Sequence, residues 1–283
     1  MTIDEDINIP RRIEIEGVQA GVDAATGDRA TSANLANETV FNGSVTLNGK
    51  ARIDGVTLKS KPVFKNVEQV TLENTRILSI SVTTGSNLDK AVIGIEQWSD
   101  PVLLIVDGCY FGDNTGIYNV FELNVPLQDG STISNNHFTA AVGSHNIINI
   151  YAVEDGANIY ITDNYFELSA SAARIGIKGD KTAVINFDGN SYDATDMYDE
   201  EGDLDYEWAG LITIQPYGTQ TISMKDIEIN IDNTIIRSDI PQQLFVYYAK
   251  ATDAQLDYIN KPTINIDGIK EDWNNLIHGR VII

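Results

Sequence analysis

Acidic side chains crowd one stretch of this chain and suggest cation binding. The segment SYDATDMYDEEGDLDYEWAG, at positions 191–210, contains eight Asp and Glu residues. Calcium takes about six to eight oxygen ligands, so carboxylates at this density could bind Ca²⁺. The candidate ligands are Asp199, Glu201, Asp203 and Asp205, although their spacing does not match an EF-hand loop. The alternative is a solvated acidic loop that binds no metal.

Aromatic residues in and beside the same segment indicate a contact surface. The candidates are Tyr192, Tyr198, Tyr206, Trp208 and Tyr217. Their rings have large apolar faces that can stack on a sugar, while neighbouring carboxylates accept its hydroxyl hydrogens. Protein interfaces are also enriched in Tyr and Trp, and core edges use the same residues. We therefore expect a glycan or a partner protein here, with packing at the edge of the core as the alternative.

Catalytic carboxylates are a weaker prediction. Glycoside hydrolysis requires two carboxylates about 5–9.5 Å apart, and Asp163 and Asp188 occupy equivalent positions of a repeated phrase. A lyase would require a basic residue, for which Arg174 and Lys178 are the candidates beside acidic residues. Because both Asp residues belong to the repeat itself, the repeat explains them without catalysis. We expect no catalytic residues, since no Ser-His-Asp, Cys-His or Gly-rich phosphate motif stands out in the sequence.

These residues must be positioned by a repeat that runs through most of the chain. Its phrase is apolar-x-apolar, then Asp or Asn, then Asn or Gly, then a bulky residue, as in ITDNYF and INFDGNSY. The Asp or Asn falls at Asp107, Asn135, Asp163, Asp188, Asp232 and Asp267, and the first two intervals are 28 residues each. Each period contains three short pieces rich in Ile, Val, Phe and Tyr, which predicts strands. A phrase that recurs at this spacing predicts a β-solenoid.

The Asp/Asn/Gly pairs of the phrase predict the corners of the coils. Asn and Gly tolerate the left-handed backbone conformation that a tight bend requires. Strands of neighbouring coils lie about 4.8 Å apart, so side chains at equivalent corners can stack. We expect a ladder of side-chain amides that includes Asn74, Asn136, Asn164 and Asn233.

The predicted fold is all-β: a right-handed parallel β-helix of about seven or eight coils with a period of about 28 residues. A β-sandwich or a β-propeller would require hairpin turns about every 8–12 residues or a period near 40–45 residues. Residues 43–283 are assigned to the β-helix. Residues 1–42 are assigned to an N-terminal arm or cap, which could attach the protein to a larger particle.

Composition restricts the partners. The net charge of −22 disfavours nucleic acid and anionic membranes, because phosphate binding requires clustered Lys and Arg. The single cysteine, Cys109, permits no disulfide within the chain. No run of 18 apolar residues is present, so we expect no membrane insertion. The acidic start MTIDEDINIP lacks the pattern of a secretory signal, which predicts a product made in the cytoplasm.

Several phrases resemble right-handed β-helix proteins of tailed bacteriophage particles, such as capsid decoration proteins, head fibres and tail spikes. They are LQDGSTISNNHF, INIYAVEDGANIYITDNYF, SAARIGIKG and EWAGLITIQPYG, and the resemblance covers residues 45–283. It implies an oligomer on the outer surface of a virion that contacts capsid proteins and surface glycans. The chain departs from large enzymatic tail spikes because it is shorter and has no evident catalytic insertion.

We therefore expect a non-enzymatic phage structural protein, a capsid-surface decoration or head-fibre protein without a cofactor, unless the acidic segment binds Ca²⁺. One alternative is a carbohydrate-active β-helix enzyme, either a polysaccharide lyase or a glycoside hydrolase, or a tail spike. Another alternative is a bacterial surface adhesin. The repeat and the resemblance favour the first expectation.

Overall fold

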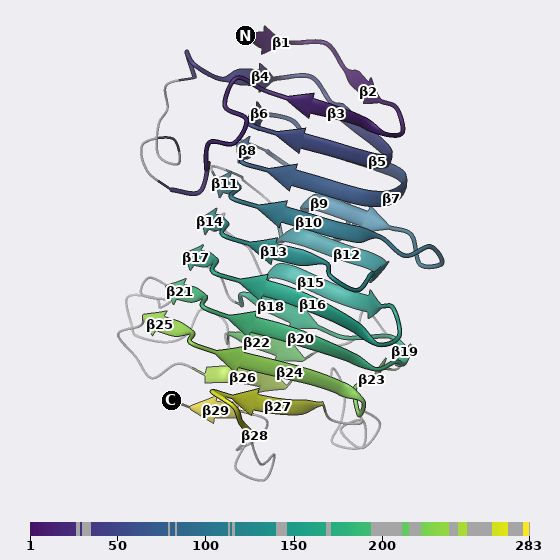
Figure 1. Ribbon diagram of the computed structural model, residues 1–283, viewed down its shortest axis with the longest axis vertical. Helices are drawn as coiled ribbons and strands as arrows, with labels where there is room; N and C mark the ends of the chain where they lie inside the picture. The colour runs from purple at the N-terminus through teal and green to yellow at the C-terminus, as the bar shows by residue number, and fades with distance from the viewer. Residues whose placement is uncertain are drawn as a thin grey trace.

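The computed structural model describes residues 1–26, 29, 35–78, 80–82, 84–112, 114, 117–139, 146–167, 171–193, 211–214, 222–237, 243–247, 262–270 and 280–282. Every element with described bounds is a β-strand, and the strands form three long sheets, in each of which they are stacked along the longest axis of the molecule (Figure 1). The described residues contain no helix long and apolar enough to cross a membrane.

Within each of the three sheets, the strands lie side by side in a fixed order. Sheet 1 contains β1 (Thr2–Ile3), β4 (Thr39–Phe41), β6 (Val56–Leu58), β8 (Arg76–Leu78), β11 (Tyr110–Gly112), β14 (His137–Thr139), β17 (Tyr165–Glu167), β21 (Ser191–Asp193) and β25 (Ile235–Arg237). Sheet 2 contains β2 (Ile7–Ile9), β5 (Val45–Asp54), β7 (Val63–Glu73), β10 (Leu103–Asp107), β13 (Thr132–Ser134), β16 (Ala157–Thr162), β20 (Ala183–Asp188), β24 (Ile227–Asp232), β27 (Thr263–Ile266) and β28 (Ile269–Lys270), and β3 (Ile13–Glu16) also pairs with β5. Sheet 3 contains β29 (Arg280–Ile282), β26 (Gln243–Tyr247), β22 (Ile212–Ile214), β18 (Ala173–Ile175), β15 (Asn146–Val153), β12 (Asn119–Leu127) and β9 (Ala91–Glu96). The short strands β19 (Gly179–Asp180) and β23 (Ile222–Ser223) pair with each other.

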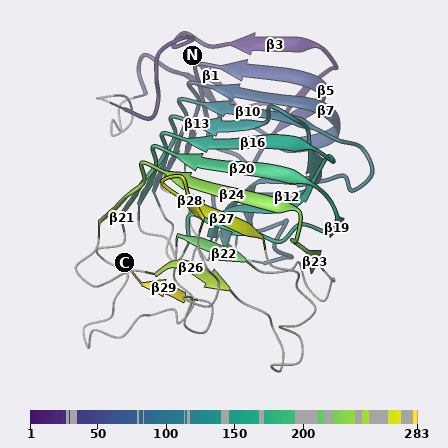
Figure 2. The ribbon, with the colours of Figure 1, turned by 60° about the horizontal axis from the view of Figure 1, so that its bottom comes forward.

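The chain visits the three sheets in a fixed order. From β9 onward it passes through sheet 3, sheet 2 and sheet 1 in turn, and each strand pairs in parallel with the strand of the preceding visit. Figure 2 shows the strands of sheet 2 running in one direction down the stack. Within the described residues, only the pairs β26–β29 and β27–β28 are antiparallel. The predicted all-β architecture with parallel sheets is confirmed, and it is compatible with a β-solenoid.

Alternating burial explains how these short sequences form the interior. In β16, the apolar Ala157, Ile159 and Ile161 are buried, whereas Tyr160 between them is exposed. Because side chains alternate across a strand, one face of each sheet lines the core and the other faces outward. In sheet 1 the inward positions form a column in which Phe111 and Phe138 stack at 5.0 Å between ring centroids.

Strands within the first 42 residues belong to the stacked sheets. β1 pairs with β4, and both β2 and β3 pair with β5. The segment after β3 packs on sheet 1, where Ala24 forms a small buried cluster with Leu78 and Tyr110. Strand pairing therefore crosses the assigned boundary after residue 42, and the division into an arm or cap and a β-helix stays a prediction. A role of this segment in particle attachment stays a prediction.

A buried ion pair ties this N-terminal segment to the stack. The Arg29 Nε donates to Glu38 Oε1 at 2.8 Å, and both side chains are at least nine-tenths buried. The Thr57 hydroxyl donates to the other Glu38 oxygen at 3.0 Å. Removing one partner of a buried pair leaves the other charge uncompensated, which typically costs about 3–5 kcal/mol.

We predict that Glu38→Ala lowers the free energy of unfolding by about 3 kcal/mol. The exposed Glu5→Ala serves as the control and should change it by less than about 0.5 kcal/mol. Urea denaturation followed by circular dichroism measures both. Equal stabilities of the two variants would show that the N-terminal segment is not anchored through Glu38.

Candidate functional site

The repeated corner gives two adjacent positions different structural roles. The first position adopts the left-handed conformation, with φ of 54° at Asn135, 55° at Asp163 and 65° at Gly189. The second position is buried, and its side chain bonds to the equivalent corner of the neighbouring repeat. Asn, Asp and Gly fit the first position because their small or locally bonding side chains tolerate positive φ.

The second position carries a ladder of buried amides. The Asn136 Nδ2 donates to Asn164 Oδ1 at 3.0 Å, and the Asn164 Nδ2 donates to Asn190 Oδ1 at 3.0 Å. The backbone N–H of Cys109 donates to Asn136 Oδ1 at 2.9 Å and ends the ladder on that side. All three Asn side chains are at most 1% exposed. The predicted ladder took the residue directly after the Asp or Asn of the phrase, which is Gly189 in this repeat. It therefore did not include Asn190.

Asn74 and Asn233 lie one position earlier, which corrects their predicted place. Both adopt the left-handed conformation, with φ of 47° and 49°. The Asn74 Nδ2 donates to Asp54 Oδ1 at 2.9 Å, and the Asn233 Nδ2 donates to Asp188 Oδ1 at 2.9 Å. They therefore form a second set of bonds between repeats, outside the ladder of Asn136 and Asn164.

The same offset separates the two Asp residues that were considered as a catalytic pair. Asp188 pairs in register with Thr162, so Asp163 lies one residue later in its own coil. The neighbour of Asp163 across the coils is Gly189, where an added Cβ would lie 2.4 Å from Asp163 Oδ1. Asp163 and Asp188 are therefore not equivalent corner residues, and their presence follows from the corner geometry.

The other predicted contact residues divide into one buried residue and a larger group that lies outside the described residues. Tyr192 is 0% exposed and follows Phe166 in the inward column of sheet 1, so its ring is not available to a glycan. Outside the described residues lie Tyr198, Tyr206, Trp208, Tyr217, Asp199, Glu201, Asp203 and Asp205. In the part of the chain that the structure describes, no group of three or more His, Cys, Asp and Glu is placed to hold a metal ion.

The outer face of sheet 3 carries a buried polar cluster. Phe121 points inward, because its ring lies edge-on to Phe138 at 6.0 Å. The next residue, Glu122, therefore faces outward, and the strand register places it beside Asn149, which in turn lies beside Arg174. Glu122 and Asn149 are each 0% exposed. This differs from sheet 2, whose outward positions are largely solvated.

Glu122 has strong hydrogen bonds on only one of its oxygens. Its Oε2 accepts from Asn149 Nδ2 at 2.7 Å and from Asn119 Nδ2 at 3.0 Å. Its Oε1 is buried without a hydrogen-bond partner, as is Asn149 Oδ1. Buried polar atoms are nearly always bonded, so such exceptions often mark a functional role or a site for water or an ion.

Burial raises the pKa of Glu122. The hydrogen bond from Asn149 and the charge of Arg174 act in the opposite direction, and the charge of Glu96 adds to the increase. The guanidinium of Arg174 lies over the Tyr151 ring, 5.3 Å from its centroid. A carboxyl group whose pKa is raised by burial is suited to donating a proton, whereas the charge of Arg174 favours its ionised form.

A bulge changes the spacing of the strands beside this cluster. The register between β12 and β15 shifts between Leu123 and Pro126, where the buried Asn124 has no partner on either side-chain polar atom. Bulges are frequent beside active sites because they redirect side chains. The sequence signal for the cluster is polar residues within otherwise apolar runs, NVFELNVPL and NIINIYAV.

Comparisons with known proteins identify no relative of the chain. No family model matches it, and neither a curated protein nor a solved structure matches it significantly.

We predict that Asn164→Ala lowers the free energy of unfolding by about 3 kcal/mol. Its Oδ1 accepts from both the backbone N–H and the side chain of Asn136, and an unsatisfied buried group costs about 1–3 kcal/mol. The exposed Asn8→Ala is the matched control. Thermal and urea denaturation measure the difference, and a loss no larger than that of Asn8→Ala would contradict a stabilising ladder.

We predict that Glu122→Gln stabilises the protein more at pH 8 than at pH 4. The pKa of Glu122 is raised in the folded protein, so its contribution to the stability of the wild type is fully present below the unfolded pKa of about 4.3. The wild type loses this contribution as the pH rises through the folded pKa. Glutamine has no such titration. Melting temperatures of wild type and variant from pH 4 to pH 8 test this, with the exposed Glu14→Gln as control. A pH-independent difference would contradict the assignment.

Proposed function

We propose that this protein is a non-enzymatic structural component of a tailed-bacteriophage particle. In this proposal, it lies on the outer surface as a capsid decoration or head-fibre protein and contacts capsid proteins. Successive visits to the three sheets close into right-handed coils. The observation that supports this role best is the use of the repeated Asp and Asn residues to bond one coil to the next.

Three features support a structural role. Asn136, Asn164 and Asn190 form a continuous buried ladder, which favours a stiff stack. The parallel sheets continue through most of the described chain, which favours an elongated spacer. The resemblance of several phrases to phage β-helix proteins supports the particle as the location, and the net charge of −22 favours a surface that stays soluble.

The proposal extends to oligomerisation, glycan contact and Ca²⁺ in the acidic segment at positions 191–210. Such β-helical virion proteins are often oligomers, and the carboxylates of this segment supply the oxygen ligands that Ca²⁺ prefers. Sedimentation with and without EDTA tests oligomerisation and its dependence on Ca²⁺ together.

We predict that the protein copurifies with intact particles produced from the genome that encodes it. Peptide mass spectrometry of density-purified particles should detect it, and immunogold labelling should place it on the outer surface. Its abundance in the lysate together with its absence from purified particles would overturn the proposal. Capsid and tail fractions of the same particles distinguish a head protein from a tail spike.

The polar cluster on sheet 3 favours a second function, that of a carbohydrate-active enzyme. Asn124 pairs with Glu96, so Glu96 lies on the strand next to Glu122 and two residues further along. Strand spacing and rise place their Cα atoms about 8 Å apart, which is compatible with a glycosidase pair. Glu96 is exposed, whereas Glu122 is buried and has a raised pKa, so the two carboxyl groups differ in environment.

This second function has its own test. An active enzyme would release reducing or unsaturated ends from acidic polysaccharides, and Glu122→Gln would abolish the release. We expect no release from the wild-type protein. Turnover that depends on Glu122 would replace the structural proposal.

A further inference from the structure

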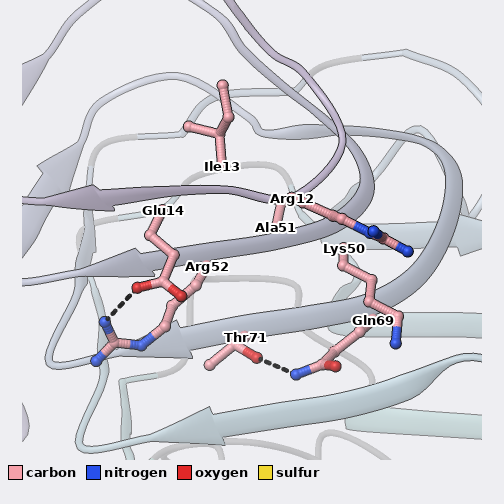
Figure 3. Close-up of a pocket in the computed structure, with 8 residues that line it drawn as sticks. All are labelled: Arg12, Ile13, Glu14, Lys50, Ala51, Arg52, Gln69 and Thr71. Carbon is pink, nitrogen blue, oxygen red and sulfur yellow. Dashed lines mark hydrogen bonds and ion pairs between the residues drawn. The ribbon is translucent and has the colours of Figure 1, made fainter.

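A polar pocket of about 250 Å³ lies on the outer face of sheet 2 near its N-terminal end (Figure 3). Its lining comes from the start of β3 and from the neighbouring strands β5 and β7. Arg12 and Lys50 extend toward the same end of the pocket in this view, whereas Glu14 and Arg52 lie at the other end. Gln69 and Thr71 bond to each other at 3.1 Å on the β7 side.

The cations of the pocket differ in how they are neutralised. Arg52 contacts several carboxylates, among them Glu73 at 2.5 Å and Asp54 at 3.0 Å. Burial lowers the pKa of Arg52, but the hydrogen bond to Glu73 and the nearby carboxylates raise it overall. Arg12 and Lys50 make no ion pair among the residues that the structure describes. Two uncompensated cations therefore face the pocket in a chain with a net charge of −22.

The backbone at Arg12 is an independent sign of function. Its φ is 66°, in the left-handed region. Every other described residue with positive φ is Gly, Asn or Asp. An arginine in this conformation costs roughly 1–2 kcal/mol relative to the right-handed form. A strained residue whose side chain lacks a counter-charge suggests that the side chain serves a ligand.

We propose that this pocket binds the carboxylate of an acidic saccharide of the uronic acid type. Arg12 and Lys50 hold the carboxylate, since guanidinium and ammonium groups form short charge-assisted hydrogen bonds with it. The Gln69 amide and the Thr71 hydroxyl bind sugar hydroxyls, and Glu14 accepts another. The small, polar volume fits one sugar residue better than an extended peptide. The inference rests on the proposed function, because it assigns the ligand class of the expected glycan contact.

Titration calorimetry of the purified full-length protein with trigalacturonate tests this inference. The neutral probe is the corresponding galactose trisaccharide, and inorganic phosphate and oligoglutamate are the other anionic probes. The variants are Arg12→Asn and Lys50→Gln, with the exposed Lys65→Gln as charge-matched control on the same sheet. Asn is chosen at position 12 because it tolerates the left-handed backbone.

We expect trigalacturonate to bind wild type and Lys65→Gln equally, and the neutral trisaccharide not to bind. Arg12→Asn and Lys50→Gln should each weaken binding about 10- to 100-fold. The melting temperature of Arg12→Asn should equal or exceed that of wild type, so that lost binding cannot be attributed to unfolding.

Three results would overturn the inference. They are equal binding of the neutral trisaccharide, binding of phosphate or oligoglutamate without trigalacturonate, and unchanged affinity in Arg12→Asn. Each of these outcomes is independent of where the protein is found, because particle association is measured separately by mass spectrometry.

Discussion

Parallel pairing of each strand with the equivalent strand of the next repeat is the constraint on which the rest of this structure depends, and the corner amides bond across that pairing. A side chain such as Asn164 bonds to Asn136 on one side and to Asn190 on the other. A slip of one residue would move every inward side chain to the outer face, so the corners determine which residues form the core. The ladder thus connects local turn chemistry to the packing of the whole stack.

The inward columns and the outward faces follow different rules once the register is fixed. Inward positions stack like on like, as Phe138 does on Phe166 at 5.2 Å, because equivalent positions of neighbouring coils are adjacent in space. Outward positions are free to vary. The outer face of sheet 2 can hold the pocket beside Arg12, and the outer face of sheet 3 can bury Glu122 without disturbing the ladder.

The strained backbone of Arg12 and the buried polar atoms of Glu122 and Asn124 that lack hydrogen-bond partners lie away from the corners. The corners use Asn, Asp and Gly, which fit the backbone, and their amides are bonded. Arg12 departs from this rule at a bend, and Glu122 and Asn124 depart from it in the interior of a sheet. Because the corner residues follow the rules of backbone geometry and hydrogen bonding, the departures at Arg12, Glu122 and Asn124 indicate candidate functional sites.

The sequence by itself determined the all-β class, the parallel stacking and the presence of corner residues, because these follow from short-range alternation and turn chemistry. Tertiary structure decided the alignment: Ser134 and Thr162 lie in register with Asp107 and Asp188, so the repeated Asp and Asn letters were equivalent in the sequence but not in space. Tertiary structure also buried Tyr192, joined residues 2–16 to the sheets, and placed Asn149 between Glu122 and Arg174. These contacts join residues from different coils, and their geometry depends on insertions of variable length that a local pattern does not encode.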